Sequence, residues 1–166
     1  DEIADCLPTA WVMKSKKQVL AIAFMALIFA PIVVWFASKE PCVDVRLCET
    51  AKALVRVDAK PGTEITLWFF HSYDRAFFEE HYLLKEDGSI LLTHMVFKSC
   101  LNGQGFEMGS YRSRPDGSAE LVGINKSVSK IFFRLGSPDM ANHTLFIGER
   151  RFRLLDYANA GDMICI

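Results

Sequence analysis

An uncharged apolar run, Val19–Ala37, limits most strongly what this chain can form. As a helix, its 19 residues would span roughly 28 Å, close to the thickness of the hydrocarbon core of a bilayer. The lysine cluster Lys14–Lys17 precedes the run, which favours a cytoplasmic amino end. The run therefore predicts one transmembrane anchor over residues 19–37, with residues 1–18 as a poorly ordered cytoplasmic segment. A buried core helix of this length is disfavoured in so short a chain.

A cleaved signal peptide is the alternative, because it also joins a positive region to an apolar stretch. Cleavage at the end of the run would place Trp35 or Phe36 at position −3, where a small residue is needed. The uncleaved anchor is therefore favoured. Met13 opens a positive-then-apolar leader, whereas residues 1–12 carry three acidic side chains, so Met13 is a candidate for the natural start.

The remainder of the chain is long enough for one domain with its own core and too short for two. The formal net charge is −1, and the basic clusters around Arg112 and Arg150 alternate with other residues, as on solvated strand faces. Nucleic acid is therefore not expected as a partner.

Short alternating or aromatic-rich segments follow one another after the anchor, separated by turn dipeptides such as Asp87-Gly88 and Asp116-Gly117. No amphipathic helix pattern interrupts them. The predicted strands are Cys42–Cys48, Ala53–Val57, Ile65–His71, Phe77–Glu86, Ser89–Ser99, Ala119–Ile124, Thr144–Ile147, Arg151–Leu155 and Asp162–Ile166. This pattern predicts an all-β fold: a single antiparallel sandwich or barrel domain over residues 42–166.

Asp87-Gly88 is the strongest hairpin signal in the chain. A two-residue loop there predicts three directly opposed pairs: Glu86 with Ser89, Leu84 with Leu91, and His81 with His94. Glu79 shares the face of His81, so His81, His94 and Glu79 form an alternative candidate for a divalent metal site. Because facing histidines also arise without metal, no metal or other cofactor is expected.

Several short motifs follow one another along this part of the chain. They are Phe70–Arg75 with Glu80 and Tyr82, the turn Ser99–Gly105, Phe133–Gly136, Asn142–Leu145, Ile147–Arg150, Leu154–Asp156 and Gly161. The set resembles a bacterial family of unknown function encoded beside TRAP transporters of the TAXI type, over roughly residues 42–166. The turn departs from the family pattern at Leu101, where the family usually has glycine, and at Gly105, where it has proline. The resemblance implies an outer β-domain beside a transporter, without a mechanism.

The candidate ligand-binding residues are His71, Ser72, Glu80, Asn102 and Gly103. His71 and Ser72 are adjacent on a strand and point to opposite faces, so they cannot act as a base and nucleophile together. His71 is expected to anchor a loop. If Glu80 points inward it needs a partner, which His71 or Arg75 could supply.

The four cysteines after the anchor allow three disulfide connectivities, and no CxxC spacing indicates zinc. Cys42 and Cys48 would lie about 20 Å apart on an extended strand, so they cannot pair with each other. Joining the first and last strands would protect sheet edges. Cys165 is therefore expected to approach Cys42 or Cys48.

The leading functional expectation is a non-enzymatic, membrane-anchored periplasmic accessory protein of a TAXI-type TRAP transport system. Its predicted location is the bacterial inner membrane, with a single span in the lipid and the C-terminal domain in the periplasm. Transporter subunits or a solute-binding protein are the expected partners. The alternative is an extracytoplasmic domain that binds a small ligand or a metal. A hydrolase is not expected, because no nucleophile–base–orienter set is recognisable.

Overall fold

The computed structural model describes residues 20–21, 24–25, 41–98 and 108–166. The chain divides into two units, residues 1–39 and 40–166. In the first unit the four described residues are helical and exposed. Almost all of the predicted anchor, Val19–Ala37, therefore lies outside the described residues. Within the described part, no helix has both the length and the apolar content that a membrane crossing requires.

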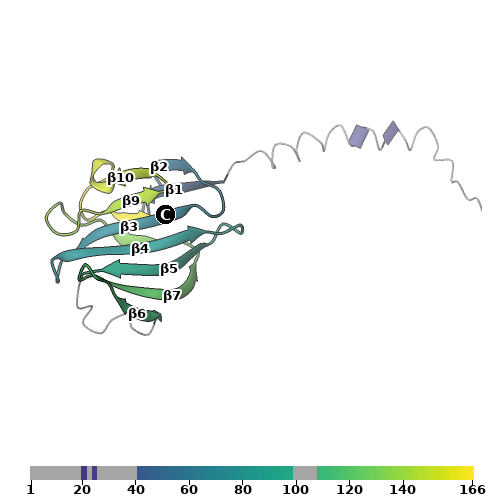
Figure 1. Ribbon diagram of the computed structural model, residues 1–166. Coiled ribbons are helices and arrows are strands. Elements are labelled where there is room, and N and C mark those ends of the chain that lie inside the picture. Colours follow the sequence, from purple (N-terminus) through teal and green to yellow (C-terminus); the bar gives the residue numbers. More distant parts are fainter. Residues whose placement is uncertain (1–19, 22–23, 26–40, 99–107) are drawn as a thin grey trace, which may run out of the picture. The chain divides into compact units, whose positions relative to one another are not determined.

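Residues 41–166 fold into antiparallel strands, as Figure 1 shows. The strands are β1 (Cys42–Leu47), β2 (Ala53–Asp58), β3 (Glu64–His71), β4 (Ala76–Leu84), β5 (Ile90–Phe97), β6 (Ser110–Ser113), β7 (Ala119–Val128), β8 (Phe132–Arg134), β9 (Thr144–Ile147), β10 (Arg150–Arg153) and β11 (Met163–Cys165). A 3₁₀ turn, Leu154–Asp156, follows β10. The predicted all-β class is confirmed.

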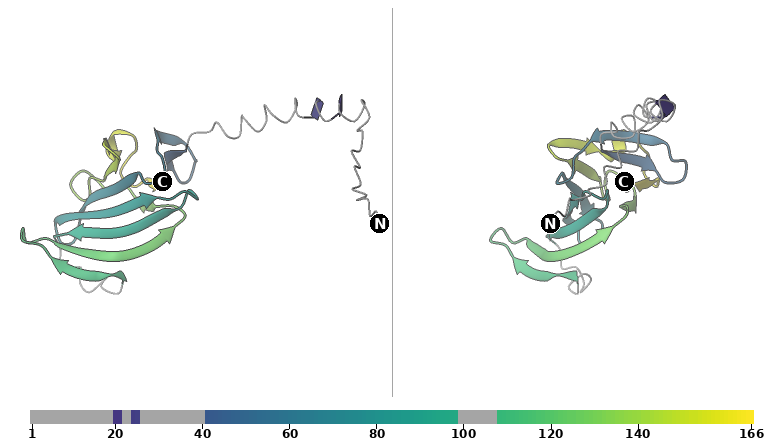
Figure 2. Two further views of the ribbon diagram at one scale, coloured as in Figure 1. Left: turned by 45° about the vertical axis from the view of Figure 1, so that its right-hand side comes forward. Right: turned by 90° about the vertical axis from the view of Figure 1, so that its right-hand side faces the viewer.

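The strands form two open sheets rather than a closed barrel within this described region. One sheet has the order β2-β1-β11-β8, and the other has the order β10-β9-β3-β4-β5-β7-β6. Figure 2 shows how the seven-stranded sheet curves from β3 towards β6. Of the two predicted architectures, a sandwich-like arrangement therefore describes the domain.

One hydrophobic core lies between the sheets, because alternate side chains of each strand point inward. The four-stranded sheet contributes the fully buried side chains of Val45 in β1 and Ile164 in β11. The seven-stranded sheet contributes those of Ile65, Leu121 and Leu145. Burial of side chains on this scale is the main favourable contribution to folding. The period-2 pattern read from the sequence therefore sets which face of each strand is buried.

The first and last strands are neighbours. Arg46 of β1 pairs with Cys165 of β11 in antiparallel register, and Cys48 forms a disulfide with Cys165 across a Cα–Cα distance of 5.2 Å. The expectation that Cys165 approaches a first-strand cysteine is confirmed, with Cys48 as the partner. Among the described cysteines, Cys42 is outside any disulfide. The sheet still keeps two open edges, β2 and β8.

The β4–β5 hairpin corrects part of the predicted register. Leu84 pairs with Ile90 rather than Leu91, and Lys85 rather than Glu86 bonds to Ser89, its N–H donating to Ser89 O at 2.9 Å. The loop therefore has three residues, and Gly88 adopts the left-handed conformation (φ 79°) that closes it.

The predicted pairing of His81 with His94 is nevertheless confirmed. A bulge at Thr93 inserts one residue into β5 between Leu92 and His94. The Thr93 hydroxyl donates to the carbonyl of His81 at 3.0 Å, which holds the bulge in place. The longer turn shifts the register by one residue, and the bulge shifts it back.

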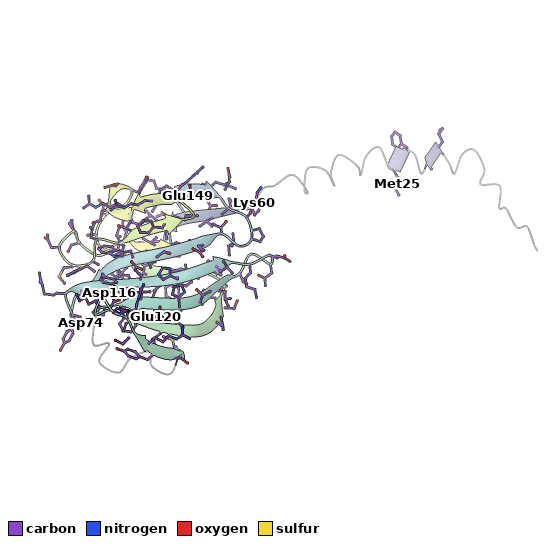
Figure 3. The ribbon with its side chains drawn as sticks, viewed as in Figure 1. Met25, Lys60, Asp74, Asp116, Glu120 and Glu149 are labelled. Atoms are coloured by element: carbon purple, nitrogen blue, oxygen red, sulfur yellow. A yellow bond between two sulfur atoms is a disulfide. The ribbon has the colours of Figure 1, made fainter. Side chains whose placement is uncertain are left out.

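Exposed loops join the strands where the sequence predicted turns. Lys60, Asp116 and Glu149 are exposed in three of them (Figure 3). Asp116 Oδ1 accepts from the backbone N–H of Ser118 at 3.0 Å, and Asp87 does the same for Ser89 at 2.9 Å. Hydrogen bonds from the hydroxyls of Ser89 and Ser118, and then these backbone hydrogen bonds, lower the pKa of both aspartates.

Candidate functional site

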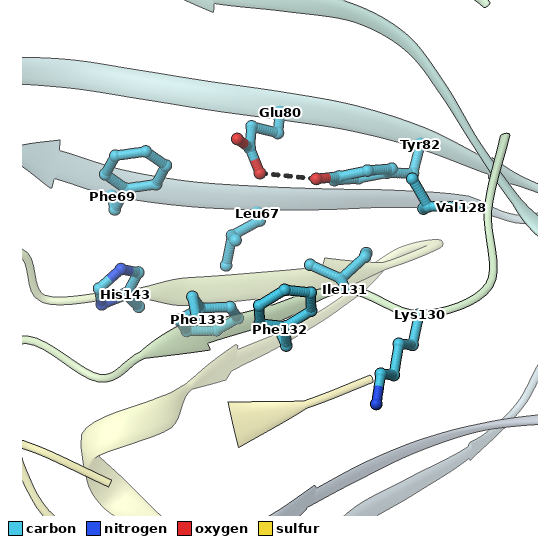
Figure 4. A pocket seen from close by; sticks show the side chains of 10 residues that line it. All are labelled: Leu67, Phe69, Glu80, Tyr82, Val128, Lys130, Ile131, Phe132, Phe133 and His143. Carbon is cyan, nitrogen blue, oxygen red and sulfur yellow. Dashed lines mark hydrogen bonds between the residues drawn. The ribbon is translucent and has the colours of Figure 1, made fainter. Parts of the chain in front are cut away.

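A pocket of about 410 Å³ opens between the two sheets. Figure 4 shows Glu80 and Tyr82 of β4 on one wall, with His143 and β8 on the opposite wall. The lining residues are Leu67, Phe69, Glu80, Tyr82, Val128, Lys130, Ile131, Phe132, Phe133 and His143. The pocket is thus mainly apolar and aromatic, with a few polar groups, as in small-molecule sites.

Glu80 points into this pocket because it lies on the inward face of β4, opposite Leu67 and Met95. Tyr82, two residues along on the same face, donates its hydroxyl hydrogen to Glu80 Oε2 at 2.6 Å. The expectation that His71 or Arg75 would be its partner is wrong. The alternation of the strand brings Tyr82 to the carboxylate, whereas His71 lies at the far end of β3 opposite Ala76.

The electrostatics of this pair follow from burial. Removal from water raises the pKa of the Glu80 carboxyl, although the hydrogen bond from Tyr82 acts in the opposite direction. Burial and the nearby Glu80 charge also raise the pKa of Tyr82, so its hydroxyl stays protonated and donates. Glu80 is therefore an acceptor in a poorly solvated site.

His143 forms part of the opposite wall. Its Nδ1 accepts a hydrogen bond from the backbone N–H of Gly136 at 3.2 Å, which leaves the ring proton of the neutral form on Nε2. The imidazole stacks on Phe133 at 4.7 Å between centroids and contacts Phe69 at 5.3 Å. Burial lowers the pKa of His143 to about 4, so the ring is neutral at physiological pH.

Of the other predicted ligand-binding residues, the two that the structure describes, His71 and Ser72, do not line the pocket. His71 ends β3, and its Nδ1 lies 2.9 Å from Asp74 Oδ2 while accepting from the Asp74 N–H at 3.4 Å. This is the loop-anchoring role expected for it. Ser72 is exposed in the same turn. Asn102 and Gly103 lie outside the described residues.

The histidine pair of the alternative metal site lies on the opposite face of the seven-stranded sheet. The rings of His81 and His94 stack almost in parallel, 4.1 Å apart at 6°. Parallel rings direct their nitrogen lone pairs along separate planes rather than towards one ion.

The nitrogens of His81 already have partners. Glu79 Oε2 and Thr66 Oγ1 each lie 3.1 Å from one of them. Burial, and then the charge of His81, lower the pKa of His94. No set of three His, Cys, Asp or Glu side chains in the described part is arranged to hold a metal ion.

Most of the pocket was not foreseen from the sequence. Glu80 was identified, and the same-face spacing of Tyr82 could have completed that pair. Phe132 and Phe133 belong to a strand of three residues, too short for a periodic signal. His143 precedes β9 in a loop, and only the pairing of distant strands brings it to Phe69.

No protein-family model, curated protein or solved structure matches this chain.

Proposed function

We propose that the β-domain binds a small organic ligand in the pocket between its sheets. The observation that carries this proposal is Glu80, a carboxylate that faces an apolar pocket and whose ionised form is disfavoured by burial. A buried carboxylate costs stability unless it is hydrogen-bonded and paired with a positive charge, and Tyr82 supplies one hydrogen bond but no charge, which favours recognition of a ligand. The pocket volume of about 410 Å³ falls within the range of roughly 300–1,000 Å³ usual for such sites.

Binding rather than catalysis is proposed for this site. The pocket lining contains one carboxylate, one phenol, one neutral imidazole and one lysine, but no serine, threonine or cysteine among its described residues. Glu80 and His143 lie on opposite walls rather than in contact (Figure 4). The lining therefore offers fixed recognition groups and apolar surface, which suit holding a ligand.

The test compares two variants of the full chain. Val128 lines the pocket at the end of β7, so Val128→Trp should fill part of the pocket. Val122→Trp is the matched control, because Val122 pairs with His94 on the other face of the same sheet. Thermal unfolding verifies that both variants fold.

Small phenyl-bearing probes, one neutral, one cationic and one anionic, are titrated by ligand-observed NMR. We expect at least one probe to bind the wild type and Val122→Trp, and binding to weaken at least tenfold in Val128→Trp. Equal binding to all three proteins would contradict the proposal, as would the absence of binding by every probe.

The accessory role in a TAXI-type TRAP system remains a second prediction, supported by the motif resemblance and the predicted anchor. It is compatible with ligand binding, because a transporter accessory could hold a small molecule. Affinity purification from native membranes tests it. A copurifying transporter subunit or solute-binding protein supports the role, and reproducible purification without either contradicts it.

A further inference from the structure

The pocket carboxylate is without a positive partner within the described part of the chain. Its only polar contact there is the hydroxyl of Tyr82 at 2.6 Å, and the ion pairs of this part involve other carboxylates. Lys130 also lines the pocket, but its side chain extends away from Glu80 (Figure 4). The second oxygen of Glu80 thus has no donor among the described residues.

The remaining walls are suited to a positive charge. Four aromatic side chains, those of Phe69, Tyr82, Phe132 and Phe133, line the same pocket. Ring faces attract ammonium groups, and the attraction grows when water is excluded. His143 stacks within this set and is neutral at physiological pH, so it adds a further ring without repelling a cation.

From the unpaired Glu80 and the aromatic lining we infer that the ligand is an organic cation, an amine or quaternary ammonium with an apolar body. This inference rests on the proposed function of the pocket. The positive group lies beside Glu80, and the apolar body packs against Phe132 and Phe133 on β8. Phe132 is 63% exposed, so it would gain cover from a bound ligand.

Two other ligand chemistries compete with this one. A neutral alcohol could donate one hydrogen bond to Glu80, and a carboxylate could engage Lys130 in the pocket lining. Neither carries the positive charge that would pair with the Glu80 carboxyl group and be attracted to the ring faces. A charge-assisted hydrogen bond is about twice as strong as a neutral one, so the three chemistries should separate clearly in affinity.

The experiment uses three probes with one skeleton: 2-phenylethylammonium, 2-phenylethanol and 3-phenylpropionate. Each is titrated into the full chain at pH 7.5 by calorimetry. We expect the ammonium to bind at least ~10-fold more tightly than the alcohol, and 3-phenylpropionate to bind most weakly. Glu80→Gln should lower the preference for the ammonium over the alcohol to the smaller part that the ring faces supply.

Glu79→Gln is the matched control. Glu79 is the neighbouring carboxylate, but it contacts His81 on the opposite face of the sheet. This variant should keep the preference for the ammonium.

An alcohol or carboxylate that binds the wild type as well as the ammonium does would overturn the cation inference and leave the ligand pocket standing. A preference for the ammonium that is undiminished in Glu80→Gln would overturn it too. A wild type that binds none of the three probes would overturn the proposed function itself.

Discussion

The buried carboxyl group of Glu80 lowers the stability of the fold when it is ionised. Its raised pKa means that the native chain binds more protons than the unfolded chain between pH 4.5 and the native pKa. Stability therefore falls as the pH rises through that window. The titratable or charged side chains that share the pocket are Tyr82, His143 and Lys130, and none forms an ion pair with Glu80 among the described contacts.

Glu80→Gln should accordingly stabilise the protein at pH 8. The amide oxygen can still accept from Tyr82, and the cost of burying a charge disappears. We expect a gain of about 1 kcal/mol in the free energy of unfolding, which vanishes below pH 4.5. Urea denaturation at pH 4, 6 and 8 measures it. A variant less stable than the wild type at pH 8 would show that the carboxylate has a stabilising partner.

His143 has the opposite pH dependence. Its pKa of about 4 lies below the ordinary 6.5, so in that interval the unfolded chain binds the extra proton. Its contribution to stability is therefore complete above pH 6.5 and is lost as the pH falls towards 4.

His143 should make the free energy of unfolding rise with pH by at most about 1.4 kcal/mol per pH unit. His143→Asn should remove this rise, because an asparagine oxygen can accept from Gly136 but does not titrate. The quantity to measure is the difference in unfolding free energy between wild type and variant from pH 4 to 7, in which the contribution of Glu80 cancels. Parallel stability curves would contradict the assignment.

Among the elements, the loop between β8 and β9 positions His143, and within this loop Gly136 and Ala141 lie unusually close together. A Cβ added to Gly136 would lie 2.4 Å from the Cβ of Ala141, far inside contact distance. Gly136 also donates the hydrogen bond to His143, so a shift of its backbone would disturb the stack on Phe133. This glycine is therefore required for space.

Gly136→Ala should lower the free energy of unfolding by roughly 1–3 kcal/mol, because the added methyl overpacks the loop. The double variant Gly136→Ala/Ala141→Gly removes the clashing methyl and should recover most of that loss. Denaturation of the two single variants and the double variant forms a cycle that measures the coupling. If the losses in unfolding free energy of the two single variants simply add in the double variant, positions 136 and 141 are not in contact.

The sheet elements could be predicted where their signals are local. The alternation of Val43 and Val45, and the turn at Asp87-Gly88, placed strands within a residue or two of their observed bounds. The register of that hairpin could not be predicted, because a three-residue loop and the Thr93 bulge offset each other. The predicted pairing of His81 with His94 was correct although the loop length was wrong. When residue pairs are counted outward from the turn, the longer loop and the bulge cancel, so the sequence reveals neither.

At the scale of the whole molecule, the disulfide between Cys48 and Cys165 links residues 117 positions apart. Constraining so long a loop restricts the unfolded chain and stabilises the fold by about 2–4 kcal/mol. Cys48→Ala/Cys165→Ala should lose that amount in urea denaturation. Cys42→Ala, at the described cysteine outside any disulfide, is the control and should change stability far less. Equal stability of oxidised wild type and double variant would contradict the prediction.

The fold class and the meeting of the first and last strands could be predicted, because edge protection and strand periodicity are general rules. The division into two sheets could not, since β3 pairs with β9 across a long stretch of chain. The pocket depends on that division. Its walls come from β3, β4, the end of β7, β8 and the residue before β9, which no local pattern brings together.

The same covalent link determines how the domain would respond to tension. A pull applied between residues 41 and 166 passes through the sulfur–sulfur bond from Cys48 to Cys165 and bypasses residues 49–164. Outside the bridge, β1 and its pairing with β2 and β11 would carry the load, whereas the seven-stranded sheet lies wholly inside the bridge and would stay folded under stretching. Cleaving the bond with a reductant would release a length of roughly 3.3–3.6 Å for each of the bypassed residues. The oxidised domain can therefore extend only by the few residues outside the bridge, whereas the reduced domain can unfold and extend along its whole length.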